Sequence, residues 1–242
     1  MDQHRQGLLK GLLAAVTFGL SAPLISTLTS AASPLVLAGL LYGGSALALL
    51  AARAVRGQSN QDSPVQRQDL GLLTLLTLIG GIAAPVCLVS GLALLSAGTA
   101  SLLLNLEAVF TMGIAILVGR EHLSRKGILA AVLIFAGSVI IGGGTTTGAT
   151  IHGAILIALA CLGWGIDNNI SQRLSIRDPM QITLLKSIGA CLPMLLVARL
   201  TGAHYPKPME VGIILVIGAI GYGLSIWLDL LALRDLGAAR DR

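Results

Sequence analysis

The sequence predicts an all-α protein, a polytopic transmembrane bundle of eight helices. Of its 242 residues, 55% are hydrophobic and 11% are charged, and the mean hydropathy is +0.86. A soluble domain carries about 25% charged residues, so this composition excludes a soluble enzyme, a disordered chain and a fibrous repeat. A helix needs about 20 apolar residues to cross a bilayer, and the chain holds eight runs of that kind.

The apolar runs follow one another with short loops between them, at about 7–26, 34–52, 70–92, 98–118, 127–144, 152–170, 180–198 and 211–233. Each run must be helical, because lipid offers no partner for open backbone groups. The first run follows Arg5 as a secretory signal would, but seven more runs come after it, so we expect an uncleaved first span. Pro23, Pro85 and Pro193 lie inside runs, where each removes a backbone hydrogen bond and permits a kink.

Glycine is abundant, with 30 residues in the chain. Glycine-rich stretches include Gly80 and Gly81 in the third run, Gly142 to Gly144 in the fifth, and Gly218 to Gly223 in the eighth. Small residues let membrane helices approach closely. We therefore expect these stretches to lie at contacts between helices.

The distribution of Lys and Arg predicts a cytoplasmic N-terminus. An eight-span path that begins inside leaves Arg199 and Lys207 outside and Lys186 within a span. The other thirteen basic residues then fall on the cytoplasmic side: Arg5, Lys10, Arg53, Arg56, Arg67, Arg120, Arg125, Lys126, Arg173, Arg177, Arg234, Arg240 and Arg242. This bias follows the positive-inside rule and indicates a multi-pass protein of the inner (plasma) membrane, with the lipid bilayer as its surroundings. The net charge of +5 is explained in this way without any nucleic-acid partner.

The chain also resembles itself at an offset of about 146 residues. Gly7 and Phe18 correspond to Gly153 and Trp164, and "ALLSAGTAS" after the third run parallels "ALRDLGAAR" at the end of the eighth. One unit holds five spans, an odd number, so the second copy must enter the membrane from the opposite face. Such inverted repeats are common in secondary transporters, which bind substrate near the midplane where the halves meet.

This repeat predicts two domains. Residues 1–146 form a first repeat of spans one to five, and residues 147–242 form a second, inverted repeat with spans six to eight. The counterparts of spans four and five are missing from the second repeat.

Several segments resemble the drug/metabolite transporter superfamily in its EamA-type branch: "AAVTFGLSAPL", "SAGTASLLLNLEAVFTMGIAILVGREHLSRKG", "GWGIDNNISQRLSIRDPMQITLLKSIGA" and "GYGLSIWLDLLALRDLGAAR". The resemblance implies ten helices in two inverted five-helix repeats, with both termini in the cytoplasm. It also implies export of a small-molecule substrate: a metabolite, an amino acid or a drug. The chain departs from this pattern by ending where the ninth helix should begin. An alternative is therefore a truncated, non-transporting membrane protein or an assembly partner, and two copies could pair as a homodimer to cover the bare surface.

Ionisable groups inside membrane spans are costly and are functional candidates. Glu107 lies near the middle of the fourth run, with Asn105 two residues before it and Thr111 four residues after it on the same helical face. Burial away from water favours the neutral form of a carboxyl group, so Glu107 is a candidate for proton coupling. The alternative is a neutral, hydrogen-bonded structural residue.

A second polar group surrounds the loop at about 171–179. Asp167 and Lys186 are equally distant from the centre of this loop, so an antiparallel hairpin places them at similar depth and predicts an ion pair. The pair could fix the register of the two helices, or bind substrate, and Lys186 could hold an anionic substrate group. Asn168 and Asn169 adjoin Asp167 as further candidates.

Three aromatic residues complete the predicted substrate site: Trp164, Tyr42 and Tyr222. We expect Asp229, about four residues from the inner end of its run, at the membrane interface, where it could meet Arg234; a place in the substrate site is the alternative. The sequence contains no catalytic motif and no metal-ligand spacing among its three cysteines, and it predicts no cofactor and no enzymatic activity. The function that it favours is secondary-active export by alternating access, with proton coupling as a hypothesis.

Overall fold

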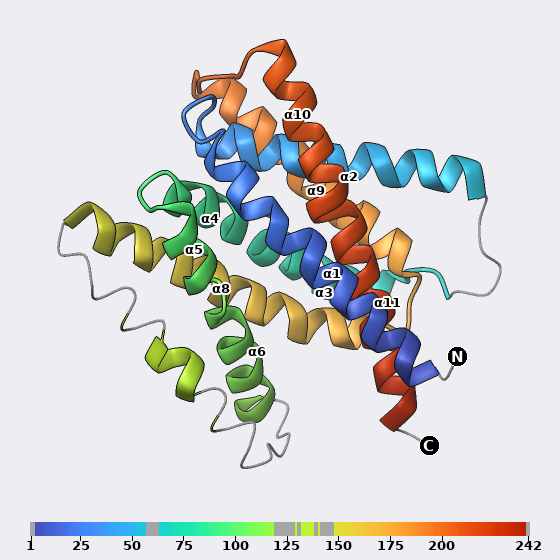
Figure 1. Cartoon of the computed structure of the whole chain (residues 1–242). Coiled ribbons are helices and arrows are strands. Elements are labelled where there is room, and N and C mark those ends of the chain that lie inside the picture. The colour runs from blue at the N-terminus through green and yellow to red at the C-terminus, as the bar shows by residue number, and fades with distance from the viewer. Residues whose placement is uncertain are drawn as a thin grey trace.

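The computed structural model describes residues 3–56, 63–118, 129, 132–137, 140 and 148–240. The N-terminal half contains α1 (Gln3–Ser26), α2 (Pro34–Arg56), η1 (Arg67–Asp69), α3 (Leu70–Leu76), η2 (Thr77–Ala83), α4 (Ala84–Leu92), α5 (Ala97–Leu103) and α6 (Leu106–Leu117). The C-terminal half contains α8 (Gly148–Leu174), α9 (Pro179–Leu200), α10 (Pro208–Gly218), η3 (Ala219–Leu224) and α11 (Ser225–Arg240). Figure 1 shows these helices crossing one another in a single bundle, with the two chain ends close together.

Seven helical segments among the described residues are long and apolar enough to cross a membrane. They coincide with seven of the runs in the sequence, and they confirm an all-α membrane bundle. The fifth predicted span, 127–144, and its glycine run lie mostly outside the described residues. Two spans are composite: α3, η2 and α4 form the third, and α10, η3 and α11 form the last.

Both composite spans change their winding near the middle. The segments η2 and η3 are π-helical, the winding in which a carbonyl accepts from the N–H group five residues later. In η2, for example, the N–H group of Ala84 donates to the carbonyl of Ile79. The glycine runs of the third and eighth spans fall in or beside these segments, where the wider winding needs room.

The helix α2 crosses the bundle between α9 and α10. Of its most apolar 18-residue stretch, 61% is buried, against 22% for α1. Its contact with α10 depends on two glycines. A Cβ atom on Gly44 would overlap the carbonyl of Leu215, and one on Gly218 would overlap the carbonyl of Leu41. The two backbones therefore approach one another as closely as glycine allows, as the sequence led us to expect for the stretch that begins at Gly218.

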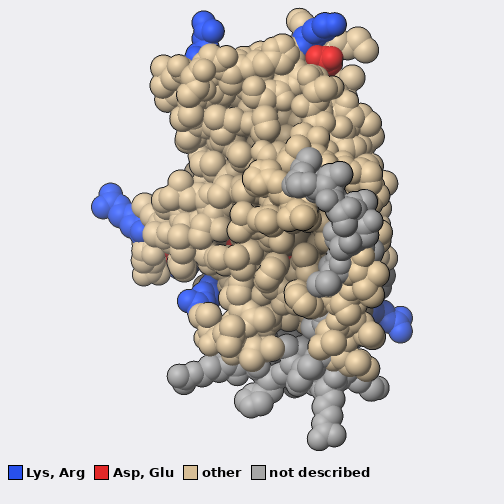
Figure 2. Space-filling view, turned by 90° about the vertical axis from the view of Figure 1, so that its left-hand side faces the viewer, with Lys and Arg blue, Asp and Glu red and all other residues tan. Residues whose placement is uncertain are grey.

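The other helices pack against one another in pairs. The helix α1 runs along η3 and α11, and α8 runs along η2 and α4 while α6 covers a further side of α8. The face of the bundle drawn in Figure 2 is apolar and shows few charges across a broad band, with Lys and Arg standing out at the margins. Many leucines of the bundle are exposed, including Leu12 and Leu20 of α1. Such a surface suits contact with lipid.

Polar contacts close both ends of the bundle. At the end where the chain termini lie, which we call the terminal end, Lys10 pairs with Asp235 at 2.6 Å and Arg177 pairs with Asp69 at 2.8 Å. At the opposite end, the N–H group of His204 donates to Ser33 Oγ at 2.9 Å. Each of these contacts joins the N-terminal half to the C-terminal half.

Candidate functional site

A cavity of about 610 Å³ lies inside the bundle. Its walls come from α1, α2, α5, α6, α8, α9, η3 and α11, so both halves of the chain contribute. Four charged side chains line it among the described residues: Glu107, Asp167, Lys186 and Asp229. Charged groups inside a membrane protein face a protein interior or a water-filled space and mark functional pathways.

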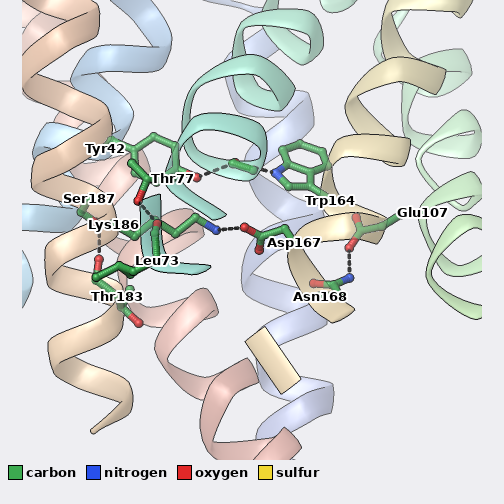
Figure 3. Close-up of polar contacts among 11 residues, drawn as sticks. Tyr42, Leu73, Thr77, Glu107, Trp164, Asp167, Asn168, Thr183, Lys186 and Ser187 are labelled. Carbon is green, nitrogen blue, oxygen red and sulfur yellow. Dashed lines mark hydrogen bonds and ion pairs between the residues drawn. The ribbon is translucent and has the colours of Figure 1, made fainter. Parts of the chain in front are cut away.

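Asp167 and Lys186 form a buried ion pair, as their spacing about the loop predicts. Lys186 Nζ lies 2.7 Å from Asp167 Oδ1, and Lys186 and Asp167 are 2% and 6% exposed (Figure 3). The loop is held by Asp178, whose side chain accepts hydrogen bonds from the N–H groups that open α9. Pro179 in the first turn also favours the start of this helix. The hairpin geometry thus places both charged groups at the same depth, where each compensates the buried charge of the other.

Space for the Asp167 carboxylate comes from the third span. A Cβ atom on Gly80 would overlap that carboxylate, so the absence of a side chain in η2 allows α8 to carry an acid there. The glycine run therefore accommodates a charged side chain of a neighbouring helix.

The carbonyl of Gly80 also binds two side chains. In π-helical winding its partner would be the N–H group of Pro85, and proline has none. Instead, Tyr42 Oη and Trp164 Nε1 both donate to this oxygen at 3.1 Å (Figure 3). One backbone oxygen thus fixes two aromatic side chains from two other helices on the cavity wall.

Glu107 stands on the α6 side of the cavity. Its Oε1 accepts a hydrogen bond from Asn168 Nδ2 at 2.9 Å, and the same amide lies 3.2 Å from Thr111 Oγ1. Asn169 instead donates to the backbone carbonyls of Thr111 and Gly165, at 3.1 Å and 2.8 Å. These bonds join α6 to α8 and hold the Glu107 carboxyl group against the site.

Aromatic rings form one continuous cluster on the cavity wall. The centroid of Phe18 lies 5.1 Å from that of Trp164 and 5.9 Å from that of Tyr222, and Tyr42 lies 5.2 Å from Tyr222. All three contacts are edge-to-face, the arrangement that aromatic quadrupoles favour. The hydroxyl groups of Tyr222 and Ser101 are buried without a hydrogen-bond partner in the described part of the chain, and both residues line the cavity.

The structure brings most of the sequence-predicted site residues together. The cavity is lined by Glu107, Asn105, Trp164, Asp167, Asn168, Lys186, Tyr222 and Tyr42. Asn169 is not part of this lining, because its amide faces the α6 backbone. Asn105 lies at the junction of α5 and α6, where its side chain donates to the carbonyl of Leu102 at 2.9 Å.

Asp229 differs from the sequence expectation. We expected it at the membrane interface, but it lines the cavity from α11. The helical spacing carried a signal for this position, since Asp229 follows Ser225 by four residues, and residues at that spacing share a helical face. Phe18, on the first span, is a further lining residue that we did not predict, although the internal repeat aligns it with the predicted Trp164.

The described residues contain no group of three or more His, Cys, Asp or Glu side chains that could hold a metal ion. The three cysteines are free thiols in separate places, with Cys161 and Cys191 buried. The cavity lining consists of carboxylates, the ammonium group of Lys186, hydroxyls, amides and aromatic rings, together with apolar side chains.

Comparisons with known proteins agree with this architecture. The family model of EamA-like transporters matches residues 5–143. An uncharacterized transporter of Methanothermobacter thermautotrophicus is 27% identical over 250 residues, which cover 96% of this chain and 73% of that relative. A solved crystal structure shares the fold at a TM-score of 0.74, with 18% identity over 96% of this chain and 80% of that one. Because the family match covers more than half of the chain, the protein belongs to the EamA-like transporter family and is a multi-pass membrane transporter.

Proposed function

We propose that this transporter is a secondary-active exporter that binds a small polar metabolite in the cavity and works by alternating access. The observation that carries the proposal is the buried pair of Asp167 and Lys186 on the wall of a space of about 610 Å³. Small-molecule sites are typically clefts of about 300–1,000 Å³ with a few placed polar groups. Transport of an amino acid or a drug-sized molecule fits the same dimensions.

We further propose that the chain is built from two inverted repeats, residues 1–146 and 147–242. Matching contacts support this division. Gly7 packs against Leu236 at the end of the last span, and Gly153 packs against Leu95 just after the third span, at opposite ends of the bundle. In the same way, α1 lies along a span with a π-helical centre, and so does α8.

Alternating access would then be a rocking of one repeat against the other around the cavity. The closing contacts support this motion, because each joins the two repeats. Opening the terminal end would break the pairs of Lys10 with Asp235 and Arg177 with Asp69. Opening the other end would break the contact of Ser33 with His204.

We propose that the terminal end faces the cytoplasm of a cell whose inner membrane holds the protein. The thirteen-to-two distribution of Lys and Arg supports this orientation. Export is then movement from the terminal end to the end that contains Ser33 and His204.

Proton coupling through Glu107 is the finer part of the proposal. Its carboxyl group is held by Asn168 on the cavity wall, within the membrane-spanning part of the bundle. A Glu107→Gln variant should keep the hydrogen-bonding shape and lose the exchangeable proton, so export should no longer depend on the external pH. If export by this variant follows pH as in the parent, Glu107 is not the coupling group.

The test of the export function is an untargeted comparison of culture media. Cells that produce the full chain are compared with cells that produce Lys186→Ala and with cells that produce Lys207→Ala, which alters a lysine before α10 and outside the cavity. We expect a metabolite to accumulate in the medium with the parent and with Lys207→Ala, and not with Lys186→Ala. Identical media from all three strains would instead favour the non-transporting alternative.

A further inference from the structure

We propose that the cavity selects substrates that carry a positively charged amine, and that Glu107 and Asp229 are the groups that bind this amine. The proposal deepens the function argued above and rests on it. It commits to a chemical class, organic ammonium cations, and it decides against binding of a substrate carboxylate by Lys186.

The charges on the cavity wall carry the first step. Among the described residues that line it, three are acids and one is a base. The base, Lys186, is 2% exposed and lies 2.7 Å from Asp167, so its charge is already matched (Figure 3). The cavity wall therefore holds two more acids than it can pair with its own base, and a low-dielectric space lined by one sign of charge concentrates ions of the opposite sign.

The placement of these two acids carries the second step. Glu107 accepts a hydrogen bond from Asn168 through Oε1, one of its two oxygens. Asp229 brings a second carboxylate to the same cavity from α11. Carboxylates form their strongest hydrogen bonds with charged donors. An ammonium group offers up to three such donors, and these two acids stand on the wall of a single cavity.

The hydroxyl of Tyr222 carries the third step. This residue is 1% exposed, it lines the cavity, and its hydroxyl has no hydrogen-bond partner among the described residues. A buried polar group without a partner costs free energy, and a ligand with N–H donors would supply one. The hydroxyl of Ser101, on the α5 side of the cavity, is likewise buried without a hydrogen-bond partner among the described residues.

The aromatic cluster carries the fourth step. Phe18, Trp164 and Tyr222 all line the cavity, and Phe18 contacts the other two edge-to-face. Ring faces attract cations, and the attraction is greater where water is excluded. An anionic ligand would meet repulsion from two carboxylates and from these ring faces, and would find Lys186 occupied.

The test uses three probes of nearly equal size and shape: 2-phenylethylamine as the cation, phenylacetate as the anion and benzyl methyl ether as the neutral compound. Each is titrated by calorimetry into the full chain purified in detergent at neutral pH. We expect the cation to bind at least about tenfold more tightly than the anion, the equivalent of one charge-assisted hydrogen bond. Equal or tighter binding of the anion overturns the proposal, and this comparison needs no variant.

Variants then locate the amine. Asp229→Asn and Glu107→Gln should each weaken binding of the cation by about tenfold and leave binding of the neutral probe unchanged. Glu210→Gln is the matched control, because this carboxylate at the start of α10 lies outside the cavity and glutamine can also fill its capping role. Unchanged cation binding in Asp229→Asn or in Glu107→Gln refutes the assigned site. A variant is taken as folded when it keeps the elution profile and melting temperature of the parent. If Asp229→Asn is unstable, Asp229→Glu replaces it, and this variant should still bind the cation.

The export assay separates this inference from the proposed function. An exported metabolite that is an amine supports both. An exported metabolite that carries only negative charge sustains the export function and overturns the choice of amines. If the cation binds in the calorimeter but the culture media of all strains are the same, the binding site is supported and the export function is overturned.

Discussion

The carboxylate of Asp167 occupies the volume that a side chain on Gly80 would fill. This relationship links the winding of the third span to the charge on α8, and so to Lys186 on α9. Three spans therefore meet at one ion pair. A change in any of them alters the cavity wall.

Replacing Gly80 by alanine tests this relationship directly. The added methyl group should push Asp167 away from Lys186 and lower the free energy of unfolding by about 1–3 kcal/mol, as overpacking of a closed core does. Thermal unfolding of the purified protein measures the effect. Gly71→Ala is the control, because a Cβ atom there meets nothing within 4 Å. Equal melting temperatures for the two variants would contradict the assigned packing.

The ion pair itself makes a second prediction. Lys186→Met leaves the Asp167 carboxylate buried without its partner, which should cost about 3–5 kcal/mol. Asp167→Asn combined with Lys186→Met removes both charges, so the double variant should be more stable than Lys186→Met alone. The double-mutant cycle measured by thermal unfolding gives the coupling. Purely additive effects would mean that the two groups do not compensate one another.

The crossing of α2 and α10 makes a third prediction. Gly44→Ala and Gly218→Ala each place a methyl group against the backbone of the other helix. Since a backbone cannot move aside as a flexible side chain does, each variant should lower the melting temperature or fail to accumulate in the membrane. Gly212→Ala on α10 has open space at its Cβ position and serves as the control. A Gly218→Ala protein as stable as Gly212→Ala would argue against this close approach.

The terminal end makes a fourth prediction, which concerns motion. Lys10→Cys and Asp235→Cys, in a background whose native cysteines are changed to alanine, should be joined by a short bifunctional thiol reagent, because the parent side chains meet at 2.6 Å. If opening of this end is part of the cycle, the joined protein should lose export and regain it when a cleavable reagent is cut. Undiminished export by the cross-linked protein would show that this end need not separate.

The sequence predicted the spans well because hydropathy is the property that the bilayer selects. It also predicted the meeting of Asp167 with Lys186, since a tight antiparallel hairpin relates positions by simple reflection. For Asp229 we ranked the substrate site second, because its distance from the end of the run said nothing about which side of α11 it faces. Its neighbours Ser225 and Tyr222 held that information.

The π-helical winding of η2 and η3 could not be foreseen from the sequence. A shift from pairing four residues apart to five leaves composition and hydropathy unchanged. The glycine run at Gly80 indicated a close contact and Pro85 indicated a missing hydrogen bond. The structure shows that the two are one feature, because the oxygen freed by Pro85 belongs to Gly80.

Because of that shared oxygen, the shape of the cavity wall depends on how the backbone of the third span is wound. Removing one residue between Thr77 and Ala83 would return this segment to α-helical pairing, because a π-helical turn is the local widening that one extra residue produces in an α-helix. Tyr42 and Trp164 would lose their common anchor together. The aromatic wall therefore depends on the wider winding of this one segment, because that winding leaves the Gly80 carbonyl free to hold both side chains.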